Sequence, residues 1–280
     1  MKVYKTIAEI RDYRNSEQSL QWGLVATMGF LHAGHLSLVK RAKQENERVV
    51  VSVFVNPIQF NNAEDLSSYP QDIERDLQLL KTAGVDAVWL PDAGEMYPEN
   101  FQTYIDVEEI SLPLEGAMRP GHFRGVTTVV GKLFNVVQPQ RAYFGQKDAQ
   151  QVAVIRQMVR DLAFPIDLVV CPILREEDGL AMSSRNVRLG KTERAEAVVL
   201  NKALQMAKQL VVEGEREVAL LLESMNRIIT TASTSRVEYI SVTDATTLKE
   251  ISEVVPKMLL SVAVFFGEVR LIDNVLIESE

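Results

Sequence analysis

The chain has 280 residues, of which 46% are hydrophobic and 24% are charged, so it can bury a sizeable core in one large domain or two modest ones. Its formal net charge of −8 argues against general binding to nucleic acid or to an anionic membrane, because both need a positively charged face. No apolar stretch approaches the roughly 20 residues that a membrane span needs, and no signal-peptide core follows Met1, so we expect a cytoplasmic protein.

The first ninety residues alternate between helix and strand signals. Thr6 and Glu9 have the spacing of a capping box, which predicts a helix that begins at residue 7. The apolar runs are Val-rich and short, as is typical of parallel strands covered on both faces. In chain order, the pattern predicts helix 7–15, strand 23–27, a helix to about 43, strand 48–55, a helix from Asp72 that ends at Gly84, and strand 85–90. This order implies a parallel sheet with right-handed crossovers.

The middle of the chain is less regular. Four prolines divide residues 91–122 into short pieces, with one predicted strand at 103–107. Cys171, the one cysteine, lies in an apolar run and indicates a buried thiol in a reducing compartment. Beyond residue 122 the pattern predicts helix 123–137, strand 142–145, helix 149–162, strand 166–173 and then a polar, irregular stretch, 174–186.

The composition changes after residue 186. The pattern there predicts two amphipathic helices followed by three strands, the last two at hairpin-like spacing: 192–212, 218–230, 237–242, 259–266 and 269–277. We therefore predict two domains. Residues 1–184 form a Rossmann-like, doubly wound α/β domain with a parallel sheet, and residues 185–280 form a smaller α+β domain.

The stretch 26–36, which runs from a predicted strand through a tight turn into a helix, carries the strongest functional signal. It leaves a predicted strand at the carboxyl edge of the sheet, where ligands bind in open α/β folds, and it begins a helix whose first N–H groups favour an anion. Gly29 permits a tight turn, and Gly34 lets a ligand approach the helix closely. His32 and His35 face the same side of the first turn and could neutralise charge that develops on a phosphate. A capped helix with two surface histidines is the plainer alternative, and a zinc site lacks a third ligand at a supporting spacing.

Two further loops also follow predicted strands. Asn56 and Gln59 offer amides that could hold a hydroxyl or a carboxylate, although an ordinary Asn-Pro turn explains them as well. In segment 145–151, Lys147 is a point charge suited to phosphate, whereas Asp148 is either a helix N-cap or an acceptor for a ribose hydroxyl. Each loop is ambiguous alone, but each would lie at the same edge of the sheet.

Two more segments hold basic side chains. Residues 182–185, at the predicted domain boundary, combine two hydroxyls with a guanidinium and could form a mobile phosphate clamp or a plain linker. Residues 119–125 hold two arginines and the third histidine, and could bind a carboxylate or cap the next helix.

The joint pattern is more specific than any of its parts. Neither a Walker-type phosphate loop nor a G-x-G-x-x-G fingerprint occurs in the sequence, and no residue set resembles an activated covalent nucleophile. We therefore predict direct in-line attack on a nucleotide phosphate, catalysed by positioning and charge stabilisation.

With these residues in hand, a family resemblance is recognisable. The run His32-Ala33-Gly34-His35 resembles the HIGH-type motif, and Met182-Ser183-Ser184-Arg185 resembles the KMSKS-type loop, of the nucleotidyltransferase superfamily. More narrowly, the chain resembles the pantoate–β-alanine ligase family over essentially its whole length. The matching segments are 27–38, 56–60, 121–130, 138–151 and 178–186.

The resemblance implies an ATP-dependent condensation in two steps. The carboxylate of pantoate attacks the α-phosphorus of Mg-ATP, giving pantoyl adenylate and pyrophosphate. The amine of β-alanine then attacks the acyl carbon and releases AMP. The resemblance also implies Mg²⁺ as the companion of ATP, and a homodimer.

The resemblance also assigns roles to residues. The residues implied for catalysis are His35, which is the proton donor, together with His32 and Lys147. Those implied for ATP are Met28, Gly29, Phe30, Leu31, His32, Ala33, Gly34, His35, Gly145, Gln146, Lys147, Asp148, Leu174, Met182, Ser183, Ser184 and Arg185. Those implied for pantoate and β-alanine are Gln59, Gln151 and Asn56, and the position proposed for Mg²⁺ is Asp76.

An attacking carboxylate has no proton to lose, so we expect His35 to stabilise transition-state charge as a hydrogen-bond donor rather than as an obligatory acid. Two positions depart from the family pattern: Phe30 replaces a small residue, and Gln146 replaces a frequent glutamate. Neither is assigned a side-chain role. The alternatives are another adenylyl- or cytidylyltransferase that stops at a nucleotide-linked product, and a regulatory nucleotide-binding module without turnover.

Overall fold

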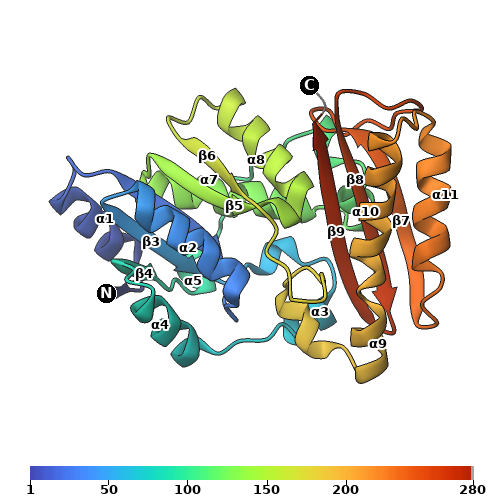
Figure 1. Cartoon of the computed structure of the whole chain (residues 1–280). Coiled ribbons are helices and arrows are strands. Elements are labelled where there is room, and N and C mark those ends of the chain that lie inside the picture. The colour runs from blue at the N-terminus through green and yellow to red at the C-terminus, as the bar shows by residue number, and fades with distance from the viewer. Residues whose placement is uncertain (279–280) are drawn as a thin grey trace. The chain divides into compact units, whose positions relative to one another are not determined.

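The computed structural model describes residues 1–278, which divide into two compact units (Figure 1). The first unit comprises residues 1–145 and 151–172, and the second comprises 146–150 and 173–280. The division therefore falls at residue 172 rather than at the predicted 184. The reason is that the loop after residue 172 bonds to the C-terminal strand, through the ion pair of Arg175 with Asp273. No helix within residues 1–278 has the length and apolar character to cross a membrane.

The first unit contains a six-stranded, all-parallel sheet, as predicted. Its strand order is β1-β4-β3-β2-β5-β6. The strands are β1(Lys2–Tyr4), β2(Trp22–Thr27), β3(Arg48–Val53), β4(Ala87–Trp89), β5(Arg141–Gly145) and β6(Asp167–Cys171). The edge strand β1 is the one strand of this sheet that the pattern analysis did not predict, because three residues, two of them exposed, carry almost no periodic signal.

Helices cover both faces of this sheet, which makes the unit doubly wound. On one face, α2(Ala33–Glu45) and α4(Ile73–Thr82) contribute Leu38 and Leu80 to a core with Val51. On the other face lie α1(Ile7–Ser16), α7(His122–Val137) and α8(Ala149–Asp161), whose apolar side chains share a core with residues such as Trp89. Adjacent residues of one strand enter different cores, as the two-residue repeat of a strand requires.

The order of the strands locates a ligand site. The chain runs from β2 outward through β3 to β4, and then returns to the other side of β2 for β5 and β6. The switch point thus lies between β2 and β5, whose carboxyl ends are Thr27 and Gly145. Ligands of open α/β sheets bind outside the carboxyl ends of strands at such a point. The predicted segments that follow residues 27 and 145 both start there.

Two element predictions were wrong. Residues 103–107 form no strand, because hydroxyl groups of α7 satisfy the backbone of Ile105: its N–H donates to Thr128 Oγ1 (3.0 Å), and its carbonyl accepts from Thr127 Oγ1 (2.6 Å). The predicted helix 192–212 is two helices, α9(Lys191–Glu196) and α10(Val199–Val212). The remaining short helical segments are η1(Pro57–Gln59), α3(Ala63–Ser67), α5(Ala93–Met96), η2(Glu109–Ser111), α6(Glu115–Met118), η3(Gln146–Asp148) and η4(Ser184–Arg188).

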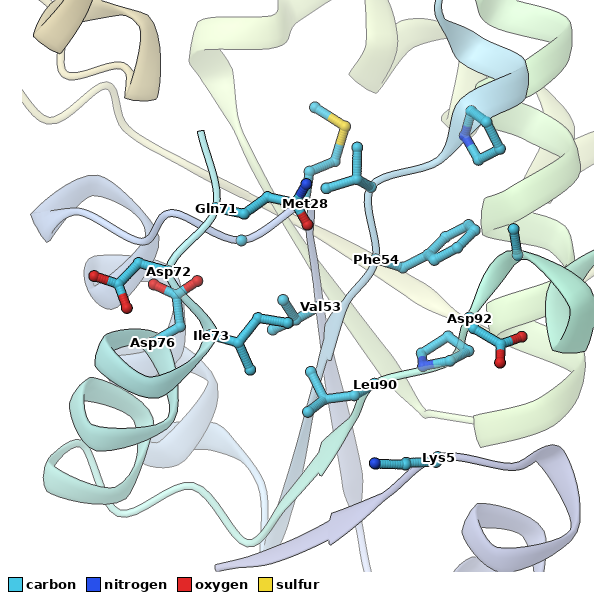
Figure 2. A pocket seen from close by; sticks show the side chains of 15 residues that line it. Lys5, Met28, Val53, Phe54, Gln71, Asp72, Ile73, Asp76, Leu90 and Asp92 are labelled. Atoms are coloured by element: carbon cyan, nitrogen blue, oxygen red, sulfur yellow. The ribbon is translucent and has the colours of Figure 1, made fainter. Parts of the chain in front are cut away.

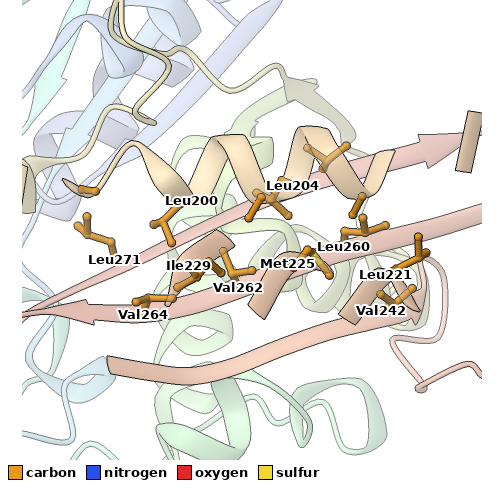
Figure 3. Close-up of a cluster of buried hydrophobic side chains, with 14 of the residues drawn as sticks. Leu200, Leu204, Leu221, Met225, Ile229, Val242, Leu260, Val262, Val264 and Leu271 are labelled. Atoms are coloured by element: carbon orange, nitrogen blue, oxygen red, sulfur yellow. The ribbon is translucent and has the colours of Figure 1, made fainter. Parts of the chain in front are cut away.

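The second unit is a smaller α+β structure, as predicted. Its antiparallel sheet has the order β7-β8-β9, with β7(Ser235–Asp244), β8(Lys257–Phe266) and β9(Val269–Glu278). Figure 3 shows how α10 and α11(Val218–Ile229) bring Leu200, Leu204 and Met225 against the side chains of β8. The predicted hairpin spacing of the last two strands is confirmed.

Candidate active site

The turn after β2 is held by a buried carboxylate. Gly29 and Phe30 both have positive φ angles, 83° and 49°, and the second is strained because Phe30 carries a Cβ. Asp76, on α4, is only 1% exposed. Its Oδ2 accepts a hydrogen bond from the N–H of Phe30 (2.7 Å), and its Oδ1 accepts one from the N–H of Leu31 (2.8 Å). The carboxylate therefore stabilises a turn that would be unfavourable on its own.

Arg75 supports the same turn from outside. Its guanidinium lies 5.3 Å from the centre of the Phe30 ring, and its Nη1 is 3.8 Å from Asp76 Oδ1. Both Asp76 oxygens accept hydrogen bonds from the turn, and the Mg²⁺ role that the sequence analysis proposed for Asp76 stays a prediction. Within residues 1–278 no group of three or more His, Cys, Asp or Glu side chains is arranged to hold a metal ion.

The two histidines at the start of α2 cap the helix. His32 is the N-cap residue, and its Nδ1 accepts a hydrogen bond from the N–H of Gly34 (3.1 Å). In return, Nδ1 of His35 accepts one from the N–H of His32 (3.3 Å). The ring centres are 4.0 Å apart. Because each Nδ1 accepts, a neutral ring carries its proton on Nε2. The two histidines therefore cap the helix, as the plainer alternative held. The same hydrogen bonds set the tautomer in which each neutral ring can donate through Nε2.

A cluster of amides lies after β3. Asn56 is 1% exposed, and its Nδ2 donates to Gln59 Oε1 (2.9 Å) and to the carbonyl of Gly125 (3.1 Å). Tyr97 donates its hydroxyl proton to Asn56 Oδ1 (2.7 Å). Burial raises the pKa of Tyr97, which keeps the phenol protonated as a donor. Sequence reasoning missed Tyr97, which lies among the irregular residues before α7 and carries no local signal.

His122 belongs to this cluster as a support. Its Nδ1 lies 2.8 Å from the backbone oxygen of Gln59, and its Nε2 lies 3.3 Å from Arg119 Nη1. The guanidinium of Arg124 stacks on the ring of Tyr104, 4.3 Å from its centre. Gly125 allows the close approach of the loop, because a Cβ there would lie 2.5 Å from the carbonyl oxygen of Ile58. Segment 119–125 thus has a role that neither alternative named, which is support of Gln59 through His122. No side chain caps α7, whose N-cap is Gly121, and carboxylate binding stays a prediction.

A cavity of about 540 Å³ opens at this edge of the sheet, within the size range of small-molecule sites (Figure 2). Met28, Gly29 and Asp76 of the predicted site line it. Apolar side chains from the ends of β3 and β4 form one wall, and the start of α4 forms another. The cavity lining includes the basic residue Lys5 and the acidic residue Asp72. Gln151, half-buried in the first turn of α8, is not part of this lining.

Lys147 lies in the second unit, in a turn that β9 holds. Asn274 Nδ2 donates to the backbone oxygens of Gln146 (3.1 Å) and Lys147 (2.9 Å). Gln146 Nε2 donates in return to Asn274 Oδ1 (3.1 Å). Asp148 is exposed at the end of this turn.

The predicted clamp is a narrow hairpin in the same unit. The N–H of Met182 donates to the carbonyl of Leu174 (3.0 Å), and Arg175 pairs with Ala181 in an isolated β-bridge. Ser183 caps the helical turn that contains Ser184 and Arg185. The hairpin is therefore ordered by its own backbone.

Ion pairs hold both ends of this hairpin. Arg194 bridges two carboxylates, with Nη2 2.6 Å from Glu176 and Nη1 2.6 Å from Asp178. The hydrogen bond from Arg194 lowers the pKa of Asp178. Arg175 binds both oxygens of Asp273, at 2.6 and 2.9 Å. The hairpin is thus fixed at its turn by Arg194 and near its open end by Arg175, while residues 182–185, which follow its second arm, are the predicted ATP residues.

A parallel sheet with paired histidine donors at its switch point and an adjacent amide cluster defines a doubly wound α/β enzyme of the nucleotide-binding class. Comparisons with known proteins specify the family. A family model described as pantoate-beta-alanine ligase matches residues 2–276. The chain belongs to the pantoate–β-alanine ligase family.

Named relatives match over their whole length. A pantothenate synthetase of Roseiflexus sp. (strain RS-1) is 53% identical over 279 residues, covering 100% of both chains. One from Moorella thermoacetica is 51% identical over 280 residues, covering 99% of each. The crystal structure of pantothenate synthetase from Thermus thermophilus matches with a TM-score of 0.94 and 48% identity, over 98% of this chain and 99% of that one.

A second solved structure is described with bound ligands. It is the pantoate-beta-alanine ligase from Francisella tularensis, complexed with beta-gamma ATP and β-alanine. It matches with a TM-score of 0.81 and 35% identity, over 99% of this chain and 97% of that one.

Proposed function

We propose that this chain joins pantoate to β-alanine at the expense of ATP, through a pantoyl adenylate, with AMP and pyrophosphate as the other products. Membership of the family and the full-length match to a relative complexed with beta-gamma ATP and β-alanine support this activity. The observation that carries the mechanism is the reciprocal capping of His32 and His35, which makes each neutral ring a donor through Nε2 at the start of α2.

In the first step, the pantoate carboxylate attacks the α-phosphorus of ATP, and negative charge grows on the departing pyrophosphate. Fixed donors aimed at developing charge are the most effective form of such catalysis, because they need no reorganisation during the reaction. His35 supplies one donor, and His32 supplies a second while holding the backbone of Gly34. Lys147 adds a positive charge on the phosphates.

Pantoate and β-alanine are assigned to the amide side of the site. Gln59 and Gln151 hold pantoate, with Asn56 as support, and Gln59 also lies near β-alanine. The bonds from Asn56 and His122 to Gln59 support this assignment, because they fix both ends of that residue. Because the amide is already held in one orientation, less conformational entropy is lost when it donates to a bound carboxylate.

The remaining predicted residues serve ATP. Met28, Gly29, Phe30, Leu31, Ala33 and Gly34 are assigned to line the ATP site at the start of α2, where the N–H groups of Phe30, Leu31 and Gly34 are used within the turn by Asp76 and His32. Gly145, Gln146 and Asp148 are assigned to ribose and phosphates, and Leu174 to adenine. The segment that follows the hairpin is assigned to the triphosphate, through Met182, Ser183, Ser184 and Arg185.

Mg²⁺ would supply charge neutralisation on the ATP phosphates, and it commonly reaches such sites with few protein ligands. The two backbone hydrogen bonds of Asp76 support a role in holding the turn rather than in holding the ion. We further propose that the protein is cytoplasmic and forms a homodimer; sedimentation analysis tests the oligomeric state.

The decisive experiment is a coupled assay of ATP, pantoate and β-alanine in which each is omitted in turn. We expect pyrophosphate release to require pantoate, and AMP release to require β-alanine. A nucleotide-linked product that accumulates despite β-alanine would instead identify a nucleotidyltransferase. ATP binding without pyrophosphate formation would identify a regulatory module.

A further inference from the structure

The C-terminal strand β9 reaches the turn that carries Lys147. Asn274 lies on this strand and is 3% exposed. Its amide makes three hydrogen bonds to residues 146 and 147, which lie about half the chain away in sequence. Both amide protons go to backbone carbonyls, and the amide oxygen accepts from Gln146. Asparagine fits this position because it offers two donors and one acceptor in one plane.

The residue before it holds the other ATP segment of the second unit. Asp273 is 2% exposed, and its carboxylate binds the guanidinium of Arg175 at the base of the hairpin. Its Oδ1 also accepts a hydrogen bond from the backbone N–H of Asn274 (2.8 Å). Two consecutive residues of one strand therefore hold the turn 146–147 and the base of the loop 174–186. The strand itself is paired along its full length with β8, which makes it a rigid support.

We propose that Asn274 is a positioning residue for the adenylation step, because it sets the backbone from which Lys147 reaches the ATP phosphates. This inference rests on the proposed role of Lys147. A lysine has a flexible four-carbon stem, so the place of its charge depends on where its backbone is held. Misplacement of a catalytic group by about 1 Å can lower a rate about 100-fold.

A purely structural role for Asn274 is the competing explanation, since any buried amide must be satisfied. The two roles differ in which kinetic step they affect. A structural defect lowers stability and every activity together. A positioning defect lowers the rate of adenylation, leaves the attack of β-alanine on the adenylate nearly unchanged, and disappears once Lys147 is removed.

The test is a double-mutant cycle with Lys147→Ala and Asn274→Ala. Adenylation is measured as pantoate-dependent exchange of pyrophosphate into ATP, and the second step as AMP release from pantoyl adenylate on addition of β-alanine. We expect Asn274→Ala to lower kcat for exchange roughly 10- to 100-fold, with less than about a threefold change in the second step. In the Lys147→Ala background, we expect it to lower exchange less than about twofold further.

Two more variants separate this role from folding. Val275→Ala removes methyl groups from the next residue of β9, which belongs to the core shared with α10 and α11, and should lower the melting temperature without a selective loss of exchange. Asn274→Ser is smaller but keeps one donor, and should give an intermediate loss. It preserves the test if Asn274→Ala does not fold.

Two results overturn the inference, and they are distinguishable. In the first, Lys147→Ala lowers exchange, and Asn274→Ala lowers it further in the Lys147→Ala background by the same factor as in the parent protein. Asn274 then does not act through Lys147. If Lys147→Ala leaves exchange unchanged, the proposed role of Lys147 is wrong, and the positioning role is lost with it.

Discussion

Asp76 binds the backbone N–H of Phe30 at 2.7 Å across 46 positions of sequence, and the neighbouring N–H at 2.8 Å. The turn that it holds contains a non-glycine residue at positive φ, which costs about 1–3 kcal/mol unless its surroundings compensate. Two charge-assisted hydrogen bonds from a buried carboxylate provide that compensation. The start of α2, and with it the pair of histidines, therefore depends on a residue of α4.

Replacement of Asp76 by Asn should damage both the turn and adenylation. The amide has one oxygen, so one backbone N–H would face an NH₂ group and remain unsatisfied. We expect the free energy of unfolding to fall by about 1–3 kcal/mol, and pyrophosphate exchange to fall roughly 10-fold or more. Urea unfolding and exchange assays measure the two effects.

Glu74→Gln is the matched control for this change. Glu74 is an exposed carboxylate in the first turn of α4 and is not part of the cavity lining, so this variant also removes one charge from α4 but leaves the turn intact. We expect both measurements to stay close to those of the parent protein. An effect as large as that of Asp76→Asn would show that loss of charge, rather than loss of the turn, is responsible.

His35→Ala should lower adenylate formation by more than about tenfold, which corresponds to ~1.4 kcal/mol of transition-state stabilisation. His35→Asn sharpens the test, since the asparagine oxygen can replace Nδ1 as the acceptor of the His32 N–H but offers nothing in place of Nε2–H. We expect this variant to keep the melting temperature and lose exchange. A loss smaller than tenfold would rule out the donor role.

Lys147→Ala should mainly damage the adenylation half-reaction, because the charge is assigned to the phosphates and not to the acyl carbon. Pyrophosphate exchange and single-turnover AMP release distinguish the two steps. A loss confined to the β-alanine step would contradict the assignment.

The segment that follows the hairpin, residues 182–188, should become protected from protease when ATP binds. Trypsin cleaves after arginine, and Arg185 and Arg188 lie in this segment. We expect slower cleavage there with ATP and magnesium, and faster cleavage in Arg194→Ala, which removes the ion pairs to Glu176 and Asp178. Equal rates with and without ATP would argue against a clamp.

Stability at low pH should depend on Glu196. Hydrogen bonds from the Thr234 hydroxyl, from the Thr234 N–H and from Ser233 lower its pKa to about 2 from the ordinary 4.5. A depressed carboxyl pKa contributes stability that is fully present above about 4.5 and is lost as the pH falls toward 2. Melting temperatures across this range should fall less steeply in Glu196→Gln than in the parent chain. Glu223→Gln, which removes an exposed charge from α11, is the control.

The sequence alone determined the elements and the class of chemistry. Hydrophobic periodicity and caps are local, so most helices and strands were predicted within a few residues, together with a parallel sheet and a smaller antiparallel unit. Glycine and histidine at a strand-to-helix turn are also local, and they pointed to the phosphate end of the site. The strand predicted at 103–107 was wrong because its backbone partners are hydroxyls of α7, which no local pattern reveals.

Tertiary structure alone decided which distant residues hold the site. Asp76 was predicted from resemblance as a metal ligand, and the structure directs its oxygens at the turn. Tyr97 and Asn274 have no motif around them, yet one holds Asn56 and the other holds the turn of Lys147. A sequence pattern reveals the periodicity of the helix or strand in which it lies. A hydrogen bond between elements depends on how folded chains meet, so its partners appear only in three dimensions.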